Sequence, residues 1–237
     1  MPKQLEVKVL GIIPARGGSK SIPYKNIVLF RGKPLIYHTI KAAKAAKLLD
    51  AVIVSTDDEK IAAVARSFGA DVPFLRPKRF AGDKSPDLEF LQHALWWLEK
   101  NRGWRPEIVV VLRPTAPTRR SADIDKVIRI IQNTGCDSVR TVTMPDKNPF
   151  KMWYFSGKDG SVLRPFAPTK HYSKWGTDVP RQALPKVFWQ NAMVDATRAK
   201  FIKKGRVYGR DIRGVVVDSE RAIDIDTYQD LKAVKRK

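Results

Sequence analysis

The sequence has 237 residues, enough for one domain with a sizeable core, and its 43% hydrophobic content excludes an intrinsically disordered chain. Its single cysteine, Cys136, excludes an internal disulfide and a cysteine-rich metal cluster. The net charge of +21 is typical of nucleic-acid-binding proteins, yet the basic residues form short, scattered clusters without a basic tail. We interpret much of this charge as an aid to solubility, and nonspecific nucleic-acid binding stays an open alternative.

Nothing in the sequence predicts contact with a membrane. The first residues lack the apolar core of a signal peptide. No apolar run approaches the roughly 20 residues that a membrane-spanning helix needs. We therefore expect a cytoplasmic protein.

The first predicted strand, residues 7–13, runs directly into a loop that is suited to an anion. Gly17 and Gly18 let backbone N–H groups approach a ligand closely. The loop also carries three cations, Arg16, Lys20 and Lys25. It is neither a Walker loop nor the GxGxxG of dinucleotide folds. A phosphate-rich ligand is the interpretation we favour, and an ordinary surface turn with solvated charges is the alternative.

Buried apolar runs alternate with segments of helical periodicity over residues 1–143. We expect strands at 52–55, 108–112 and 137–143, a helix from about Pro34, a helix ended by Gly69, and helices whose N-caps are Ser85 and Ser121. This alternation predicts an α/β fold with a mostly parallel sheet and helices on both faces. Ligands of such sheets bind beyond the carboxyl ends of the strands. The loops at Arg16, 55–58 and 113–118 should therefore share one rim.

The pattern changes after Met144. Residues 145–190 are rich in proline and in aromatic side chains, namely Phe150, Trp153, Tyr154, Tyr172 and Trp175. Segments 151–155 and 161–163 are predicted to form a hairpin around two glycines. So much aromatic surface favours an inserted arm that makes an interface over a loop without structure.

Two carboxylates near the C-terminus are candidates for a metal site. In an extended chain Asp224 and Asp226 lie on one face, and Ile223 and Ile225 lie on the other. Paired carboxylates offer oxygen ligands to a hard cation such as Mg²⁺. The alternative is that one aspartate merely caps a final helix over residues 228–234.

The string Pro14-Ala-Arg-Gly-Gly-Ser-Lys-x-Ile-Pro-x-Lys-Asn26 closely resembles the nucleotide-binding signature of the CMP-sialic acid synthetases, the acylneuraminate cytidylyltransferases. Further matching patches follow in the same order as in that family: Ser55-Thr-Asp57, Leu75-Arg-Pro77, Leu112-x-Pro-Thr-x-Pro117, Pro180-Arg-Gln-x-Leu-Pro185 and Ile223-Asp-Ile-Asp-Thr227. The Pro-Thr-x-Pro element resembles the sialic acid branch, since the related KDO-activating branch has Gly-Asp-Glu-Pro there.

The resemblance implies a Rossmann-like nucleotidyltransferase, a single domain over residues 1–237 with a dimerisation and sugar-binding arm at about 145–190. It implies a homodimer that uses CTP and Mg²⁺ (or Mn²⁺) to activate a nine-carbon 2-keto sugar acid, giving the CMP-sugar and pyrophosphate. Legionaminic or pseudaminic acid and a different base stay open. The competing class is a non-catalytic basic nucleic-acid-binding protein on the same fold.

The resemblance also implies roles for individual residues. Nucleotide contacts fall on Ala15, Arg16, Gly17, Gly18, Ser19, Lys20, Lys25, Asn26 and Arg76. Sugar contacts fall on Arg113, Lys151, Arg181, Gln182 and Asn191. Asp224 and Asp226 match the metal ligands, and together with Arg16 and Lys25 they are the expected catalytic residues. Two departures leave the choice of sugar and base open: Arg113 stands where relatives usually have Gln, and Trp189-Gln-Asn-Ala192 stands where many have Arg-Pro-Asn-Gly.

Overall fold

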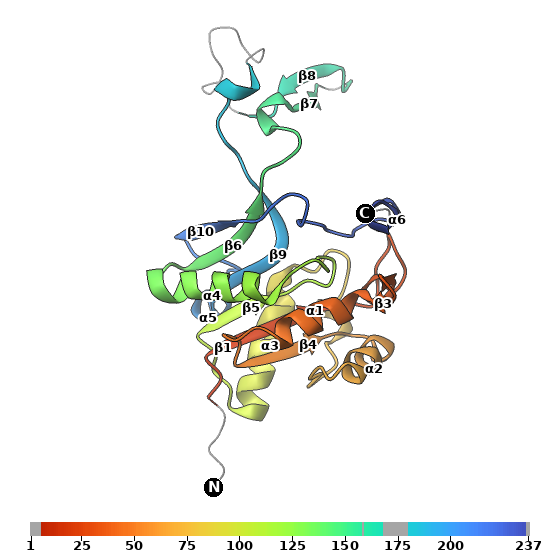
Figure 1. The fold of residues 1–237 in the computed structure, drawn as a ribbon, viewed down its shortest axis with the longest axis vertical. Helices are drawn as coiled ribbons and strands as arrows, with labels where there is room; N and C mark the ends of the chain where they lie inside the picture. The colour runs from red at the N-terminus through yellow and green to blue at the C-terminus, as the bar shows by residue number, and fades with distance from the viewer. Residues whose placement is uncertain (1–5, 158, 168–179, 236–237) are drawn as a thin grey trace.

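A six-stranded sheet in the order β10-β6-β9-β5-β1-β4 forms the centre of the computed structural model, which describes residues 6–157, 159–167 and 180–235 (Figure 1). Its strands are β1 (Val9–Pro14), β4 (Ala51–Ser55), β5 (Ile108–Val111), β6 (Ser138–Thr143), β9 (Trp189–Arg198) and β10 (Ile212–Val216). Every pairing is parallel except those of β9, which is antiparallel to both β5 and β6. The predicted mostly parallel sheet is confirmed.

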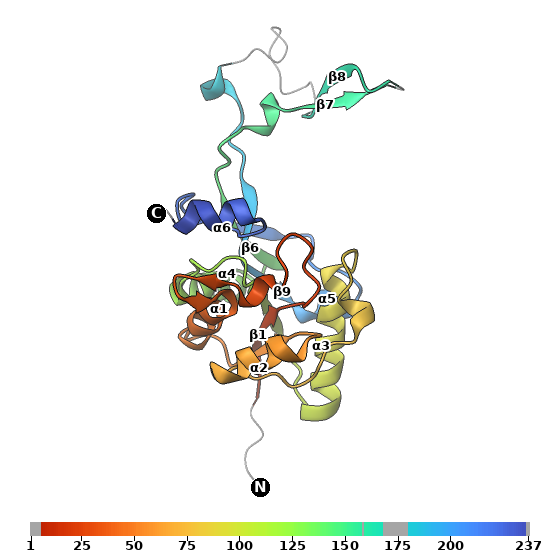
Figure 2. The same ribbon diagram turned by 90° about the vertical axis from the view of Figure 1, so that its right-hand side faces the viewer.

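Helices cover both faces of the sheet, as the alternation in sequence predicts (Figures 1 and 2). In β1, Val9 and Ile13 pack with α1, α2 and α4, whereas Leu10 and Ile12 pack with α3 and α5. This period of two is expected of a strand that is buried on both sides. The helices are α1 (Leu35–Lys44), α2 (Glu59–Ser67), α3 (Asp87–Arg102), α4 (Ser121–Thr134), α5 (Ala199–Lys203) and α6 (Tyr228–Lys235).

Two predicted N-caps lie one position away from the observed ones. The cap of α3 is Pro86, because the hydroxyl of Ser85 donates instead to the carbonyl of Arg79 at 3.1 Å. The cap of α4 is Arg120, whose backbone N–H donates to the Asp123 carboxylate at 2.9 Å. Gly69 does end α2, in the left-handed conformation with φ of 72°.

The arm leaves the sheet between β6 and β9 and extends away from it (Figure 1). Its hairpin pairs β7 (Trp153–Ser156) with β8 (Val162–Pro165). The short 3₁₀ helices η3 (Pro149–Lys151) and η5 (Arg181–Ala183) lie in the part of the arm farther from the sheet (Figure 1). Phe155 is 70% exposed, and neighbouring aromatic side chains are exposed as well. Tyr172 and Trp175, which the prediction also placed in the arm, lie outside the described residues.

Small elements beside the sheet complete the fold: η1 (Lys25–Ile27), β2 (Leu29–Phe30), β3 (Lys33–Pro34) and η2 (Lys78–Phe80). Both views show α6 at the end of the sheet from which the arm rises (Figures 1 and 2). Across the described ranges, no helix has both the length and the apolar character that crossing a bilayer requires.

Candidate active site

A cleft of about 750 Å³ opens where β1 and β5 end. Its walls are the loop after β1, the segment before α3, the loop after β5 and the segment before α6. Nine residues that the sequence analysis assigned to the site line it together: Arg16, Ser19, Lys20, Lys25, Asn26, Arg76, Arg113, Asp224 and Asp226. The expectation that ligand-binding loops share the carboxyl rim of the sheet is therefore met for the loops at Arg16 and 113–118.

The loop at 55–58 supports the glycine-rich loop from outside the cleft. The backbone N–H of Gly17 donates to Asp57 at 2.9 Å, and that of Ala15 donates to the carbonyl of Ser55 at 3.0 Å. Asn26 Nδ2 donates to the carbonyl of Arg16 at 2.9 Å and closes the loop from its far end. Ala15, Gly17 and Gly18 themselves do not line the cleft.

Acidic residues of the cleft hold the loop cations in place. Arg16 Nη1 lies 2.9 Å from one oxygen of Asp83, and Lys20 Nζ lies 2.7 Å from the other. The hydrogen bond from Lys20 is the main reason that the pKa of Asp83 is lowered. Lys25 Nζ pairs with Asp226 Oδ1 at 2.6 Å. A phosphate in this cleft would compete with Asp83 for the hydrogen bonds of two cationic side chains, Arg16 and Lys20.

Arg76 is almost entirely buried at the side of the cleft. Its Nε donates to Ser55 Oγ at 3.1 Å, its Nη1 donates to the carbonyl of Phe80 at 3.4 Å, and its guanidinium lies 4.8 Å from the centre of the Phe90 ring. Burial lowers the pKa of Arg76 to about 10, so the side chain stays charged at neutral pH. These contacts tie the segment before α3 to β4 and thus shape this wall.

The carboxylate pair is positioned by a buried isoleucine between its members. Ile225 is buried in a cluster that includes Phe30 and Leu35, and its N–H donates to the carbonyl of Thr115 at 2.8 Å. Because side chains alternate along extended backbone, Asp224 and Asp226 both turn toward the cleft, as predicted. Neither one caps α6: Thr227 Oγ1 accepts from the N–H of Asp230 at 3.3 Å and fills that role.

Asp224 has the features of a cation ligand. Burial raises its pKa, and the charge of Asp226 raises it further, against a hydrogen bond from Thr115 and the charge of Lys25. Its Oδ1 is buried and has no hydrogen-bond partner among the described residues. A bound cation would satisfy this oxygen, so the pair fits Mg²⁺ or Mn²⁺ with phosphate and water oxygens as the other ligands. Within the described ranges no group of three or more Asp, Glu, His or Cys side chains could hold a metal.

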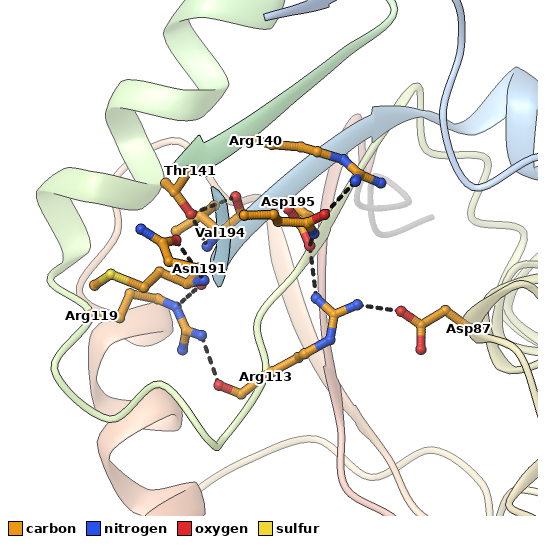
Figure 3. Close-up of polar contacts among 10 residues, drawn as sticks. Asp87, Arg113, Arg119, Arg140, Thr141, Asn191, Val194 and Asp195 are labelled. Carbon is orange, nitrogen blue, oxygen red and sulfur yellow. Dashed lines mark hydrogen bonds and ion pairs between the residues drawn. The ribbon is translucent and has the colours of Figure 1, made fainter. Parts of the chain in front are cut away.

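Arg113 lies on the cleft floor between two carboxylates, where its Nη1 donates to Asp195 at 2.7 Å and its Nη2 donates to Asp87 (Figure 3). Burial opposes the charged form of Arg113, but both carboxylates outweigh it and raise its pKa. The sequence analysis did not connect these two aspartates, or Asp83, with the site. Asp87 is an acid in the first turn of α3, where it matches the helix dipole, so its position has a local explanation that gave no pointer to the site. Asp195 and Asp83 carried no signal in the sequence.

Four of the predicted sugar-binding residues do not line the cleft of their own chain. Lys151, Arg181 and Gln182 lie in the arm, and the last two line a separate hollow of about 260 Å³ there. Asn191 is fully buried in β9, where its Oδ1 accepts from the N–H of Met193 at 3.3 Å. The structure leaves their contact with a sugar as a prediction.

Ala192, which does line the cleft, has a strained backbone. Its φ of 54° lies in the left-handed region, beside the irregularity where the register of β6 and β9 shifts. An alanine here costs about 1 kcal/mol relative to glycine, which adopts this conformation freely. We expect Ala192→Gly to raise the free energy of unfolding by roughly 0.5–1 kcal/mol, measured by urea denaturation. A drop in stability would show that the alanine methyl group packs well enough to outweigh the strain.

The class of protein follows from comparison with known proteins, and the fold and the cleft agree with it. The sheet is mostly parallel, and the cation-bearing loop and the carboxylate pair lie at its carboxyl rim, where open α/β sheets bind their ligands. The chain belongs to the cytidylyltransferase family, whose model, described as "Cytidylyltransferase", matches residues 10–151. It is therefore an enzyme of the nucleotidyltransferase type, and the hypothesis of a non-catalytic binding protein was wrong.

Individual relatives agree with this assignment. The chain is 29% identical to an N-acylneuraminate cytidylyltransferase of Escherichia coli over 96% of its own residues and 51% of that protein, so it spans about half the length of this relative. It is 32% identical to a CMP-N,N'-diacetyllegionaminic acid synthase of Legionella pneumophila, over 93% of this chain and 92% of that one. A solved CMP:2-keto-3-deoxy-manno-octonic acid synthetase complexed with CTP has the same fold, with a TM-score of 0.70, 17% identity and 97% of both chains covered.

Proposed function

We propose that this chain transfers the cytidylyl group of CTP to a nine-carbon 2-keto sugar acid of the sialic, legionaminic or pseudaminic type. The products are the CMP-sugar and pyrophosphate. One observation carries the proposal: the cationic loop and the carboxylate pair meet in one cleft, where Lys25 and Asp226 are 2.6 Å apart. Two relatives support this choice of substrate. One is named an N-acylneuraminate cytidylyltransferase, and the other is named a CMP-N,N'-diacetyllegionaminic acid synthase.

In the proposed reaction the anomeric hydroxyl of the sugar attacks the α-phosphorus in line. The new O–P bond forms as the bond between the α-phosphorus and the bridging oxygen to the β-phosphate breaks, pyrophosphate leaves with that electron pair, and the proton of the attacking hydroxyl passes to solvent water. Arg16, Lys20 and Lys25 would hold the triphosphate and neutralise the charge that builds up on the leaving group. Fixing the two reactants in line supplies much of the remaining acceleration.

Asp224 and Asp226 would hold Mg²⁺ or Mn²⁺ in this scheme. Such a cation, when bound, neutralises phosphate oxygens and lowers the pKa of a coordinated hydroxyl. Oδ1 of Asp224 is buried and has no partner in the part of the chain that the structure describes, which supports this role, because an isolated carboxylate oxygen away from water is costly unless a ligand satisfies it.

The arm would complete the cleft of a second copy of the chain in a homodimer. Its exposed aromatic side chains, Trp153, Tyr154 and Phe155, support this view, since patches of this kind mark interfaces. Arg181, an exposed residue of the arm, would bind the sugar carboxylate through the bidentate geometry that guanidinium groups offer.

We expect Arg181→Ala to raise the KM for the sugar acid by about 10- to 100-fold, because a hydrogen-bonded ion pair is lost. The KM for CTP should stay within twofold. Arg164→Ala is the matched control, since Arg164 is an exposed arm cation whose Nε donates only to Ser156 Oγ among the described residues, at 3.0 Å. Steady-state kinetics with each substrate varied in turn gives both constants. An unchanged sugar KM would remove Arg181 from carboxylate binding.

A mixing experiment tests whether the arm acts in a partner's cleft. Asp224→Asn should inactivate its own cleft. Arg181→Ala should leave little activity at a sugar concentration well below its raised KM, and the mixture is assayed at that concentration. If arms act across the dimer, a mixed dimer has one cleft with both residues intact, and activity returns when the two variants are combined. If each arm serves its own cleft, every cleft in the mixture stays defective and no activity returns.

The acceptor is identified by a panel of 2-keto sugar acids offered with CTP and Mg²⁺, with pyrophosphate release as the readout. We expect turnover with at least one nine-carbon acid and none with an eight-carbon acid. Turnover with the eight-carbon acid alone would contradict the proposed acceptor class.

Nonspecific nucleic-acid binding by this basic chain stays a prediction from its charge.

A further inference from the structure

Arg113 is clamped by two other elements of the fold (Figure 3). Asp87, the first residue of α3, and Asp195, within β9, accept from different terminal nitrogens of its guanidinium. The backbone carbonyl of Arg113 is also fixed, because it accepts from Nη2 of the buried Arg119 at 2.7 Å. The Arg113 side chain is nevertheless 25% exposed, and it lines the cleft.

A second row of contacts holds Asp195 (Figure 3). The oxygen that accepts from Arg113 also accepts from Gln190 Nε2 at 2.9 Å, and Gln190 in turn accepts from Arg140. Asp195 is only 14% exposed, so its carboxylate has little freedom to move. We call this set the Arg113 relay: Asp87, Arg113, Asp195, Gln190 and Arg140. It fixes the guanidinium at one place on the cleft floor.

The relay gives the cleft floor hydrogen-bond donors without a net positive charge. Two carboxylates contact one guanidinium, so an anion that approached it would meet two fixed negative charges within a few ångströms. A guanidinium has five N–H donors, and only two of those of Arg113 have a hydrogen-bond partner among the described residues. The remaining donors suit an uncharged oxygen, such as a hydroxyl or an amide carbonyl.

The loop side of the cleft is different in character. There Arg16 and Lys20 share the single carboxylate of Asp83, and an anion that displaces it gains both cations. Charged phosphates therefore belong to the loop side, and an uncharged part of the second substrate belongs beside Arg113.

We propose that Arg113 selects the acceptor sugar by donating hydrogen bonds to an uncharged oxygen of that sugar, and that Asp195 is its positioning residue. This inference rests on the proposed function, in which the sugar carboxylate is bound elsewhere. It assigns to the Arg113 relay the recognition of the substituents that distinguish one nine-carbon acid from another.

Asp195→Asn tests the inference, since it keeps the shape of the side chain and removes the charge that orients the guanidinium. We expect the KM for the acceptor to rise about tenfold, while kcat and the KM for CTP stay within twofold. The carboxamide of the same sugar acid serves as a competitive inhibitor. Asp195→Asn should bind it more weakly than the wild type does, by the same factor, because the carboxamide keeps the uncharged oxygens that Arg113 is proposed to contact. Asp71→Asn is the matched control: Asp71 pairs with both terminal nitrogens of Arg102, outside the cleft.

Each outcome has one meaning. An unchanged acceptor KM in an active Asp195→Asn enzyme overturns the inference alone, as does an acceptor KM that rises while the affinity of the carboxamide stays the same. The absence of turnover by the wild-type enzyme with CTP and every sugar acid overturns the proposed function and, with it, this inference. If Asp195→Asn does not fold, Arg113→Lys keeps the charge, loses the clamp and must show the same rise in acceptor KM.

Discussion

Asp224→Asn is expected to lower kcat by roughly a thousandfold or more while the protein folds normally. Asparagine keeps the shape of the side chain but loses the charge that would hold a cation against the phosphates, and losses of this size follow removal of one strong electrostatic contact in an active site. Pyrophosphate release under saturating substrates measures the effect. Asp218→Asn is the control, because Asp218 is exposed and lies outside the cleft in the same C-terminal segment.

The same substitution should make the protein more stable at neutral pH. The pKa of Asp224 is raised in the folded protein, mainly by burial, so the folded state disfavours the charged carboxylate relative to the unfolded state. This penalty is absent at a pH below the ordinary carboxyl pKa, where both states are protonated. It grows as pH rises from the ordinary pKa to the raised value, and it is fully present above the raised value. We therefore expect the Tm of Asp224→Asn to exceed that of the wild type at pH 7 and to converge with it near pH 3. Retained turnover, or a lower Tm at pH 7, would contradict this account of Asp224.

Gly17→Ala is expected to lower kcat/KM for CTP by about 100-fold, since a displacement of the loop by even 1 Å has costs of this order. A Cβ at residue 17 would lie 2.9 Å from Asp58 Cβ and 3.0 Å from Asp58 Oδ2. Asp58 cannot move away freely, because its Oδ1 accepts from the N–H of Ile61 at 3.0 Å and caps α2. The loop must shift instead, and we expect a loss of roughly 1–3 kcal/mol in the free energy of unfolding.

Gly18→Ala is the matched control for this clash. A Cβ at residue 18 has no neighbour within 4 Å, and the backbone there is not in the left-handed region. For both variants we would measure kcat/KM for CTP and the free energy of unfolding in urea. We expect both quantities to fall in Gly17→Ala and to change little in Gly18→Ala. Equal effects at residues 17 and 18 would show that the loop needs glycine for mobility and that the contact with Asp58 is not the cause.

Local patterns in the sequence were sufficient for the part of the fold that comes first in the chain. Val9 and Ile13 on one side, and Leu10 and Ile12 on the other, predict a strand buried on both faces, and the structure agrees. When the first strands are parallel, the loops that follow them lie at one rim of the sheet. The presence of Arg16 and Arg113 in one cleft could therefore be predicted from the order of strands and helices alone. The alternation around Ile225 likewise placed Asp224 and Asp226 on one side.

Long-range pairing was beyond the reach of the same reasoning. The strand β9 enters the sheet between β5 and β6 in the opposite direction, and nothing local in Trp189–Arg198 marks that position. The partner of Arg113 in β9 is 82 residues away in the chain, so the clamp on its guanidinium depends on where β9 is inserted. The sequence showed that Arg113 and the segment ending at Ala192 were unusual, and only the fold shows that both line the same cleft.

The most direct test of the central claim is phosphorus NMR of a reaction that contains the full chain, CTP, Mg²⁺ and a nine-carbon 2-keto sugar acid. The account predicts that the three resonances of CTP give way to one phosphodiester resonance and one pyrophosphate resonance in a 1:1 molar ratio, as required when attack occurs at the α-phosphorus. Formation of CDP with a phosphorylated sugar would place the attack of the sugar at the γ-phosphorus instead, and CDP with inorganic phosphate would show hydrolysis by water. Either result, or CTP that remains intact with every acid, would contradict the assignment of this cleft to cytidylyl transfer.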